Sequence, residues 1–375
     1  MSKRTGSKNV LQILNYSAPY RGNFMQSLLR LEERLLNDNI QMVYLFCKAA
    51  ESKDWVQQLI REKKLVYFLS GSKAKDIKLI SGLVSRHNIG IIHNHFIGVS
   101  NIFLLNVIRR FRKKNFLIVR HLHNPYTSNK RMIEYLKRTF SHVDLSIGCS
   151  KAVADDYEIK KMDKREKVAY ATNAIDFLRL DNYATLEKRS LNIAEGHFIL
   201  LVFGFDYFRK GIDILVQAVY ELVNSGQKIC LLISLADNRE FAENEIKKQL
   251  GEMPGWIKLV APRNDIATYY KLADAFISSS RSEGFCYSLV EAAYCGTQVM
   301  ASDIFAQKDL NIPYTFSYAV EDITELKRQI LLAMNVSSGE RAARSSVQKD
   351  YAMKTFNLDK WATEIVELYR YNQNA

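Results

Sequence analysis

The sequence contains few cysteines, and they are not arranged as a disulfide framework or a metal site. Its 375 residues include five cysteines, which are scattered and include no C-x-x-C pair. A disulfide framework and a cysteine-based zinc site are therefore not expected, and a reducing cytoplasm is the expected compartment. The length exceeds what one hydrophobic core usually supports, so two domains are expected.

Long apolar runs are also absent. No run approaches the roughly 18 apolar residues of a membrane span. The basic N-terminal stretch leads directly into a strand-like segment and has no signal-peptide core. There are no short-period repeats and no low-complexity tracts. Together these absences favour globular domains over membrane-spanning, fibrous or disordered classes.

The net charge of +13 is unevenly distributed. Residues 1–190 carry 34 lysines and arginines against 17 acidic residues, whereas residues 191–375 carry 19 against 23. The excess is either an ordinary solvated surface or a face that meets an anionic membrane. The densest cluster of basic residues comprises Arg109, Arg110, Arg112, Lys113 and Lys114. Apolar residues are interleaved with them, which is typical of a helix that lies on an anionic bilayer. No nucleic-acid-binding module is recognisable, so nucleic acid is not an expected partner.

Short β-rich runs alternate with stretches of helical periodicity in both halves. Strands are expected at 10–14, 41–46, 65–69, 89–93, 116–122, 144–150 and 167–171, and again at 198–204, 229–234, 256–261, 275–280 and 297–302. Helices are expected between them, for example at 24–37, 74–87 and 99–113. This alternation predicts two α/β doubly wound domains with parallel sheets, joined around 178–197. Ligands of such sheets bind beyond the carboxyl ends of the strands.

Lys210 follows the first strand of the second half, at the point where a loop gives way to a helix. A lysine there can meet a phosphate, although an ordinary surface lysine has the same local pattern. The segment is not a P-loop, because the G-x-x-x-x-G-K-[ST] spacing is missing.

Two glutamates bracket the start of another helix, which Gly296 is expected to end. Glu283 lies in the turn, and Glu291 lies about one turn into the helix. The first amides, around 286–289, form a potential anion site with unpaired N–H donors. Glu291 leans towards the helix start. Its carboxylate would repel a phosphate bound there, so we expect it to accept hydrogen bonds from neutral hydroxyls, such as those of a ribose. Glu283 would then face the group beyond the phosphates; two solvated glutamates are the alternative.

These residues resemble the family 4 glycosyltransferases. The E-x7-E segment with its neighbours comprises Glu283, Gly284, Phe285, Glu291, Ala292, Gly296 and Thr297. The K-G-x-D at 210–213, "TNAID" at 172–176 and "IIHNHF" at 91–96 also fit the family. Residues 16–35 are similar to the N-terminal loop and helix of members that build bacterial surface polysaccharides. The resemblance extends from about residue 10 to 371.

The resemblance implies a GT-B fold with two Rossmann-like domains facing a cleft. It implies an acceptor-side domain at 1–185, a nucleotide-sugar domain at 190–354 and a C-terminal helix at 355–375 that crosses back to the first domain. It also implies retention of anomeric configuration without a cofactor or metal. No D-x-D motif is present to hold a divalent ion.

The resemblance also assigns roles to individual residues. Glu283, His123 and Lys210 take the catalytic positions. Donor binding falls to Glu291, Lys210, Arg209, Gly22, Gly284, Phe285, Cys286, Tyr287, Ser288, Leu289 and Arg263, the last beside uracil. His95, His121 and Arg21 lie on the acceptor side. His95 is preferred to His93 because it falls where the strand is expected to give way to a loop.

Some positions depart from the family pattern. Phe205 stands where an arginine is usual, so Arg209 or Arg21 is a candidate to replace it. Gln298 replaces a proline, and Ser234-Leu235-Ala236 replaces a G-x-G.

The function expected first is a retaining transferase that moves a sugar from a UDP-sugar to a lipid-linked saccharide at the inner face of the cytoplasmic membrane. A non-catalytic GT-B subunit that binds a glycan or a partner transferase is the alternative. A nucleotide-sugar 2-epimerase fits the E-x7-E context less well.

Overall fold

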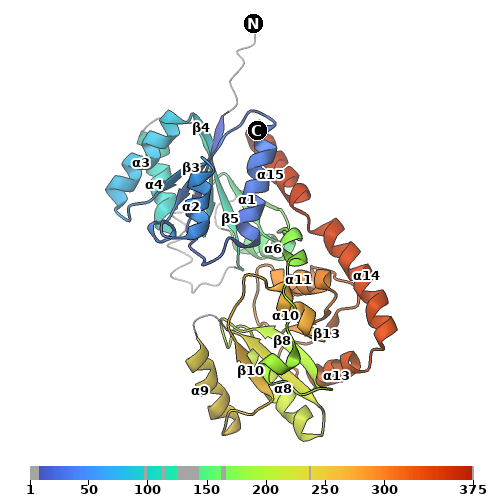
Figure 1. Ribbon diagram of the computed structural model, residues 1–375. Helices are drawn as coiled ribbons and strands as arrows, with labels where there is room; N and C mark the ends of the chain where they lie inside the picture. The colour runs from blue at the N-terminus through green and yellow to red at the C-terminus, as the bar shows by residue number, and fades with distance from the viewer. Residues whose placement is uncertain are drawn as a thin grey trace. The chain divides into compact units, whose positions relative to one another are not determined.

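A computed structural model describes residues 8–96, 99–111, 115–125, 143–161, 166–235 and 238–373. The chain divides into two compact units (Figure 1). The first unit comprises Met1–Ala174 and Leu358–Ala375, and the second comprises Ile175–Asn357. Each unit contains one sheet, and all paired strands within it are parallel. Parallel strands need covering helices, which agrees with the strand–helix alternation of the sequence.

The first sheet has the strand order β3-β2-β1-β4-β5-β6-β7. Its strands are β1 (Asn9–Leu14), β2 (Met42–Phe46), β3 (Leu65–Phe68), β4 (Ile89–His95), β5 (Leu117–Leu122), β6 (Leu145–Gly148) and β7 (Lys167–Tyr170). Its helices are α1 (Gly22–Leu36), α2 (Asp54–Arg61), α3 (Lys73–Arg86), α4 (Val99–Phe111), α6 (Lys151–Lys160) and α15 (Leu358–Gln373).

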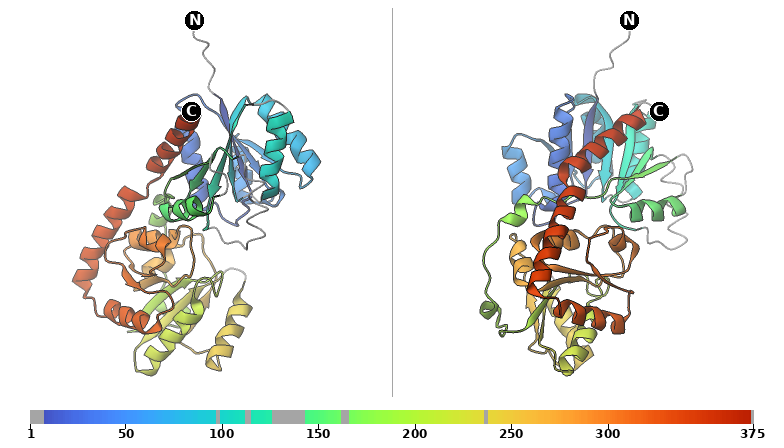
Figure 2. Two further views of the ribbon diagram at one scale, coloured as in Figure 1. Left: turned by 180° about the vertical axis from the view of Figure 1, so that it is seen from behind. Right: turned by 90° about the vertical axis from the view of Figure 1, so that its right-hand side faces the viewer.

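Alternate residues of β1 enter two different cores. Val10 and Leu14 belong to one cluster, and Leu11 and Ile13 belong to the other, because successive strand side chains point to opposite faces. Helix α15 contributes to the first cluster through residues that include Trp361 and lies beside α1 (Figure 2). The predicted return of the C-terminal helix to the first domain is thus confirmed.

The second sheet has the order β10-β9-β8-β11-β12-β13. Its strands are β8 (Phe198–Phe203), β9 (Ile229–Ser234), β10 (Ile257–Val260), β11 (Ala275–Ser278), β12 (Gln298–Ser302) and β13 (Phe316–Tyr318). Its helices are α7 (Leu178–Asp181), α8 (Ile212–Asn224), α9 (Arg239–Leu250), α10 (Ala267–Leu272), α11 (Tyr287–Cys295), α12 (Phe305–Lys308), α13 (Ile323–Met334) and α14 (Ser338–Thr355).

The division between the units differs from the boundary expected at residue 185. Residues from Ile175 onwards belong to the second unit, where the Ile175 amide donates to the carbonyl oxygen of Phe356 at 2.8 Å. Asp181 accepts a hydrogen bond from the Tyr294 hydroxyl at 2.8 Å. These contacts hold 175–181 against the second unit, although the segment lacks apolar periodicity. Strand β13 was also not predicted, because three residues are too few to show a period.

The strand orders determine which loops are neighbours. Strands β8 and β11 lie side by side although about 70 residues separate them in the chain. Strands β1 and β4 are neighbours in the first sheet, and β5 follows β4. Open parallel sheets bind ligands beyond the carboxyl ends of their strands, where the strand order changes direction. The candidate site residues follow these strands.

Only part of the basic cluster lies in the described residues. Arg112, Lys113 and Lys114 lie outside them. Arg110 is exposed at the end of α4, whereas Arg109 donates to Asp144 at 2.7 Å and is therefore held within the unit. In the described part of the chain, every helix is too short or too polar to cross a membrane.

Candidate functional site

A glycine brings together the two loops that carry Lys210 and Glu283. Gly211 precedes α8 with φ of +63°, and a Cβ on it would lie 2.1 Å from the carbonyl oxygen of Ser279. The Ser279 hydroxyl donates to the Lys210 carbonyl oxygen at 2.7 Å. The loop after β8 therefore packs directly on the segment that follows β11. Any side chain at Gly211 would meet backbone that cannot move aside.

Glu283 is surrounded by positive and hydrogen-bonding groups. Lys210 Nζ lies 2.5 Å from its Oε1 atom, and the Ser280 hydroxyl donates to the same oxygen at 2.7 Å. Arg209 Nη1 approaches Oε2 at 3.5 Å. The Lys210 and Glu283 residues are only 7% and 8% exposed, so each charge needs the other. The loops thus bring all three predicted residues together.

Phe205 lies beside both cations instead of supplying a third. The Lys210 Nζ atom lies 4.6 Å from the centre of this ring, and the Arg209 guanidinium carbon lies 5.1 Å from it. The negative face of an aromatic ring attracts cations at such distances. Arg209 also donates to Ser282 O at 3.0 Å, which directs it towards Glu283. Adjacent loop residues often point apart, but Arg209 and Lys210 both point at one carboxylate.

Glu291 is buried on α11 and has two partners that sequence reasoning missed. The Tyr270 hydroxyl donates to Oε2 at 2.9 Å, and Arg179 donates to Oε1. Burial raises the pKa of Tyr270 well above its ordinary value, so this hydroxyl remains a donor. Arg179 lies on α7, in the segment expected to belong to the first domain, and no local pattern links it to Glu291. The predicted ribose acceptor is therefore already oriented by two donors.

The start of α11 differs from the expected row of unpaired amides. The Tyr287 amide donates to Phe285 O and the Leu289 amide donates to Cys286 O, both at 3.2 Å. The side chains of Phe285, Cys286 and Leu289 are buried, whereas Tyr287 and Ser288 are partly exposed. A tight first turn satisfies these donors locally. The buried side chains of Phe285, Cys286 and Leu289 therefore pack within the unit, and the Leu289 amide already has a backbone acceptor.

Arg263 follows β10, as expected, but its charge is already paired. It donates two hydrogen bonds to Asp265, at 2.9 and 2.8 Å. This bidentate contact lowers the pKa of the Asp265 carboxyl below its usual range. The predicted contact of Arg263 with uracil remains a prediction.

The first unit places Gly22 and its neighbours after β1. Gly22 has φ of +59°, and a Cβ on it would lie 3.2 Å from the Tyr16 hydroxyl. Arg21 immediately precedes α1. The ring of Phe24, in the first turn of this helix, lies 5.1 Å from the ring of His95 and 5.4 Å from that of His123. The first turn of α1 therefore meets the carboxyl ends of β4 and β5.

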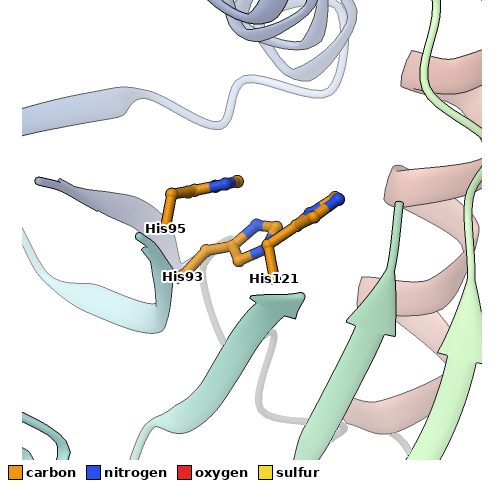
Figure 3. Close-up of side chains that lie close together, drawn as sticks. All are labelled: His93, His95 and His121. Carbon is orange, nitrogen blue, oxygen red and sulfur yellow. The ribbon is translucent and has the colours of Figure 1, made fainter. Parts of the chain in front are cut away.

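Four histidines gather at these strand ends (Figure 3 shows three of them). The register pairs His95 directly with His121, and the rings of His93 and His95 are 4.2 Å apart. Burial lowers the pKa of all four imidazoles, that of His121 to about 3, so they are neutral near pH 7. His93 and His95 are both fully buried within β4. The prediction that the strand ends before His95 is therefore wrong.

Neutral imidazoles are also metal ligands. The candidate nitrogens of His93, His95 and His121 all lie within 4.8 Å of one another, close enough to hold an ion. In the rest of the described chain no comparable histidine, cysteine or carboxylate group was found.

Known proteins are similar to both units. Over 182 residues, the chain is 30% identical to "Alpha-monoglucosyldiacylglycerol synthase" of Streptococcus pneumoniae. This match covers 45% of the chain but only 40% of the relative's length. A glycosyltransferase structure from Rickettsia africae covers 98% of each chain with a TM-score of 0.78 at 15% identity. The structure of Anabaena HepE with UDP and glucose covers 97% of this chain and all of HepE, with a TM-score of 0.76 at 15% identity.

The fold of both units is thus that of GT-B glycosyltransferases, as predicted. Residues 184–349 match the family described as "Glycosyl transferases group 1". This range contains Lys210, Glu283 and Glu291. The second half of the chain is therefore similar to the group 1 glycosyl transferases.

Proposed function

We propose that this protein is a retaining glycosyltransferase that moves a sugar from a UDP-sugar to a lipid-linked saccharide. The convergence of Lys210, Arg209 and Glu283 beyond the ends of β8 and β11 carries the proposal. As the bond between the sugar and the diphosphate breaks, negative charge collects on the leaving phosphate. Cations that are already in place stabilise that charge more than they stabilise the bound substrate.

The two glutamates have different roles in this proposal. Glu291 accepts hydrogen bonds from the ribose hydroxyls, with Tyr270 and Arg179 keeping the carboxylate in position. Glu283 orients the reacting sugar and holds Lys210 until the diphosphate arrives. The site requires no divalent ion, because Lys210 and Arg209 supply the positive charge. UDP and glucose bound to the structurally similar HepE support a UDP-sugar donor.

The acceptor and the location follow from different observations. The name of the S. pneumoniae relative denotes a glucosylated diacylglycerol, which supports a lipid acceptor. The positive charge of the first half supports contact with the anionic inner face of a membrane. A non-catalytic subunit would need neither donor chemistry nor Lys210.

The release of UDP from a panel of UDP-sugars tests the proposal. The purified protein, with EDTA present, should release UDP slowly from its own donor even without an acceptor. The Lys210→Ala variant is the control for contaminating enzymes. Absence of both UDP binding and UDP release would contradict the proposal and favour the non-catalytic subunit.

A further inference from the structure

The buried histidines of the first unit belong to a continuous chain of hydrogen bonds. It runs through strands β1, β4 and β5 and reaches Tyr369 on α15. At one end, His123 Nε2 lies 3.2 Å from His95 Nδ1, and His95 Nε2 lies 3.0 Å from Gln12 Oε1. Gln12 Nε2 lies 3.3 Å from the Tyr369 hydroxyl. At the other end, the Tyr369 hydroxyl lies 2.6 Å from His93 Nδ1, and His93 Nε2 lies 3.3 Å from His121 Nδ1.

Such a chain has a direction, because a neutral imidazole has one N–H donor and one bare acceptor nitrogen. A reversal at an imidazole or at the amide would place two donors or two acceptors against each other. Two arrangements, which run in opposite directions, satisfy all five links and give the Tyr369 proton an acceptor. A third arrangement, in which the Tyr369 hydroxyl accepts from both Gln12 and His93, leaves the proton of this buried hydroxyl without an acceptor in the chain, so it is disfavoured.

Gln12 decides between the two arrangements. It is completely buried, and its Nε2 atom lies 3.5 Å from the sulfur of Met42 as well as 3.3 Å from the Tyr369 hydroxyl. The two amide N–H groups thus have two acceptors. In the flipped orientation the amide oxygen would face the sulfur, and two acceptors would be in contact. The amide oxygen therefore faces His95 and accepts its Nε2–H.

The direction of the whole chain follows. His95 donates from Nε2, so its Nδ1 is bare and accepts the Nε2–H of His123. On the other branch Tyr369 accepts from Gln12 and donates to His93, which in turn donates to His121. The chain ends at His121 Nε2, a buried nitrogen without a hydrogen-bond partner among the described residues.

We propose that Gln12 and His95 are positioning residues that hold His123 in the Nε2–H tautomer, with a bare Nδ1 that accepts a hydrogen bond from a sugar hydroxyl. His123 follows β5 and is the partly exposed member of the cluster, so it is the one that can meet a ligand. The tautomer is independent of the proposed function; only the use of Nδ1 towards a sugar rests on that function.

Nitrogen–proton correlation spectra of the full chain, labelled at histidine and free of substrate, test the tautomers. The His123→Gln variant assigns the His123 signals. The wild-type protein should show His123 protonated at Nε2 alone. A His123 that carries its proton on Nδ1 would overturn the inference, whatever the activity of the enzyme.

Two variants separate positioning from packing. Gln12→Met removes the acceptor of His95 and should give a mixture of tautomers at His123, with UDP release reduced roughly tenfold to 100-fold. Tyr369→Phe removes a link on the other branch and should leave His123 and turnover unchanged. Equal effects of the two variants, or no effect of Gln12→Met, would contradict the proposal.

A third variant decides the question even if Gln12→Met does not fold. In Gln12→Glu the carboxylate accepts from both His95 and Tyr369, so His93 and His121 should exchange tautomers while His123 keeps its own. If the tautomers of His93 and His121 do not change in this variant, the proposed direction of the hydrogen-bond chain is refuted. If stoichiometric zinc shifts the ring nitrogens of His93, His95 and His121 together, the cluster is a metal site, and the proposal is likewise overturned.

Discussion

Lys210 places its ammonium nitrogen 2.5 Å from a carboxylate oxygen of Glu283, and both side chains are buried. A bound diphosphate would compete with Glu283 for this ammonium group. Lys210 would then shift from one anion to the other as the donor binds, and its positive charge would remain paired throughout.

Removing either cation should slow the reaction more than it weakens binding. Lys210→Ala should lower turnover on the order of 100-fold, because charge on the diphosphate grows towards the transition state. Arg209→Ala should lower it about tenfold, because its contact with Glu283 is longer, at 3.5 Å. Steady-state UDP release and UDP calorimetry measure the two effects.

Arg239→Ala is the matched control for the charge itself. Arg239 is exposed on α9 and pairs with Glu243, so turnover should be unchanged. A similar loss in all three variants would mean that net charge, and not position, sets the rate. Wild-type turnover of Arg209→Ala would leave Lys210 as the sole cation that the second unit contributes.

Gly211→Ala should destabilise the second unit and reduce activity. Its control is Gly226→Ala, since Gly226 also has a positive φ of +93° but has nothing within 4 Å of an added Cβ. Backbone strain alone should cost Gly226→Ala about 1 kcal/mol. Gly211→Ala should cost roughly 2 kcal/mol more, because its Cβ meets the Ser279 backbone. Calorimetric unfolding that shows equal losses would exclude the close approach as the cause.

Stability should fall as the pH drops below about 6.5. The pKa of His121 is lowered to about 3 in the folded chain, so below pH 6.5 the unfolded chain binds more protons than the folded one. This difference favours unfolding progressively as pH falls, by about 2 kcal/mol at pH 5 for this one group.

Urea unfolding at pH 7 and pH 5 measures this contribution. The His121→Gln variant should lose less stability than the wild type between these two values. An equal pH dependence of the two proteins would show that the buried cluster does not set it.

Binding to anionic vesicles should depend on the members of the basic cluster other than Arg109. Changing Arg110, Arg112, Lys113 and Lys114 to Gln should abolish sedimentation with vesicles, and salt should weaken wild-type binding steeply. Arg109 is left unchanged, because its ion pair with Asp144 belongs to the fold. Changing Lys247 and Lys248 of α9 in the same way is the control. Unaltered sedimentation of the cluster variant would contradict a role of these residues in membrane binding.

The sequence predicted the strands and the neighbourhood of Lys210 and Glu283 for a physical reason. Parallel strands place the loops after them at one edge of a sheet, so residues that follow β8 and β11 meet there. The contact of Arg179 with Glu291 could not be predicted in this way. The two residues are 112 positions apart, and α7 has only four residues and no periodicity.

The histidine cluster was only partly foreseen. His121 and His123 were expected to share a face because they are two apart on a strand, as are His93 and His95. The two pairs come together only because the register of β4 and β5 places His95 opposite His121. This register depends on tertiary packing. The links through Gln12 and Tyr369 bring in β1 and the C-terminal helix, and local sequence carries no signal for them.

The most direct test of the account is UDP calorimetry on two variants that differ only in which glutamate is lost. Glu291→Ala should weaken UDP binding by about 1.5–3 kcal/mol for each hydrogen bond lost to a charged acceptor. Glu283→Ala should bind UDP at least as tightly as the wild type, because Lys210 is released, yet turn over far more slowly. If Glu283→Ala loses UDP binding while Glu291→Ala keeps it, the assignment of the two carboxylates is contradicted.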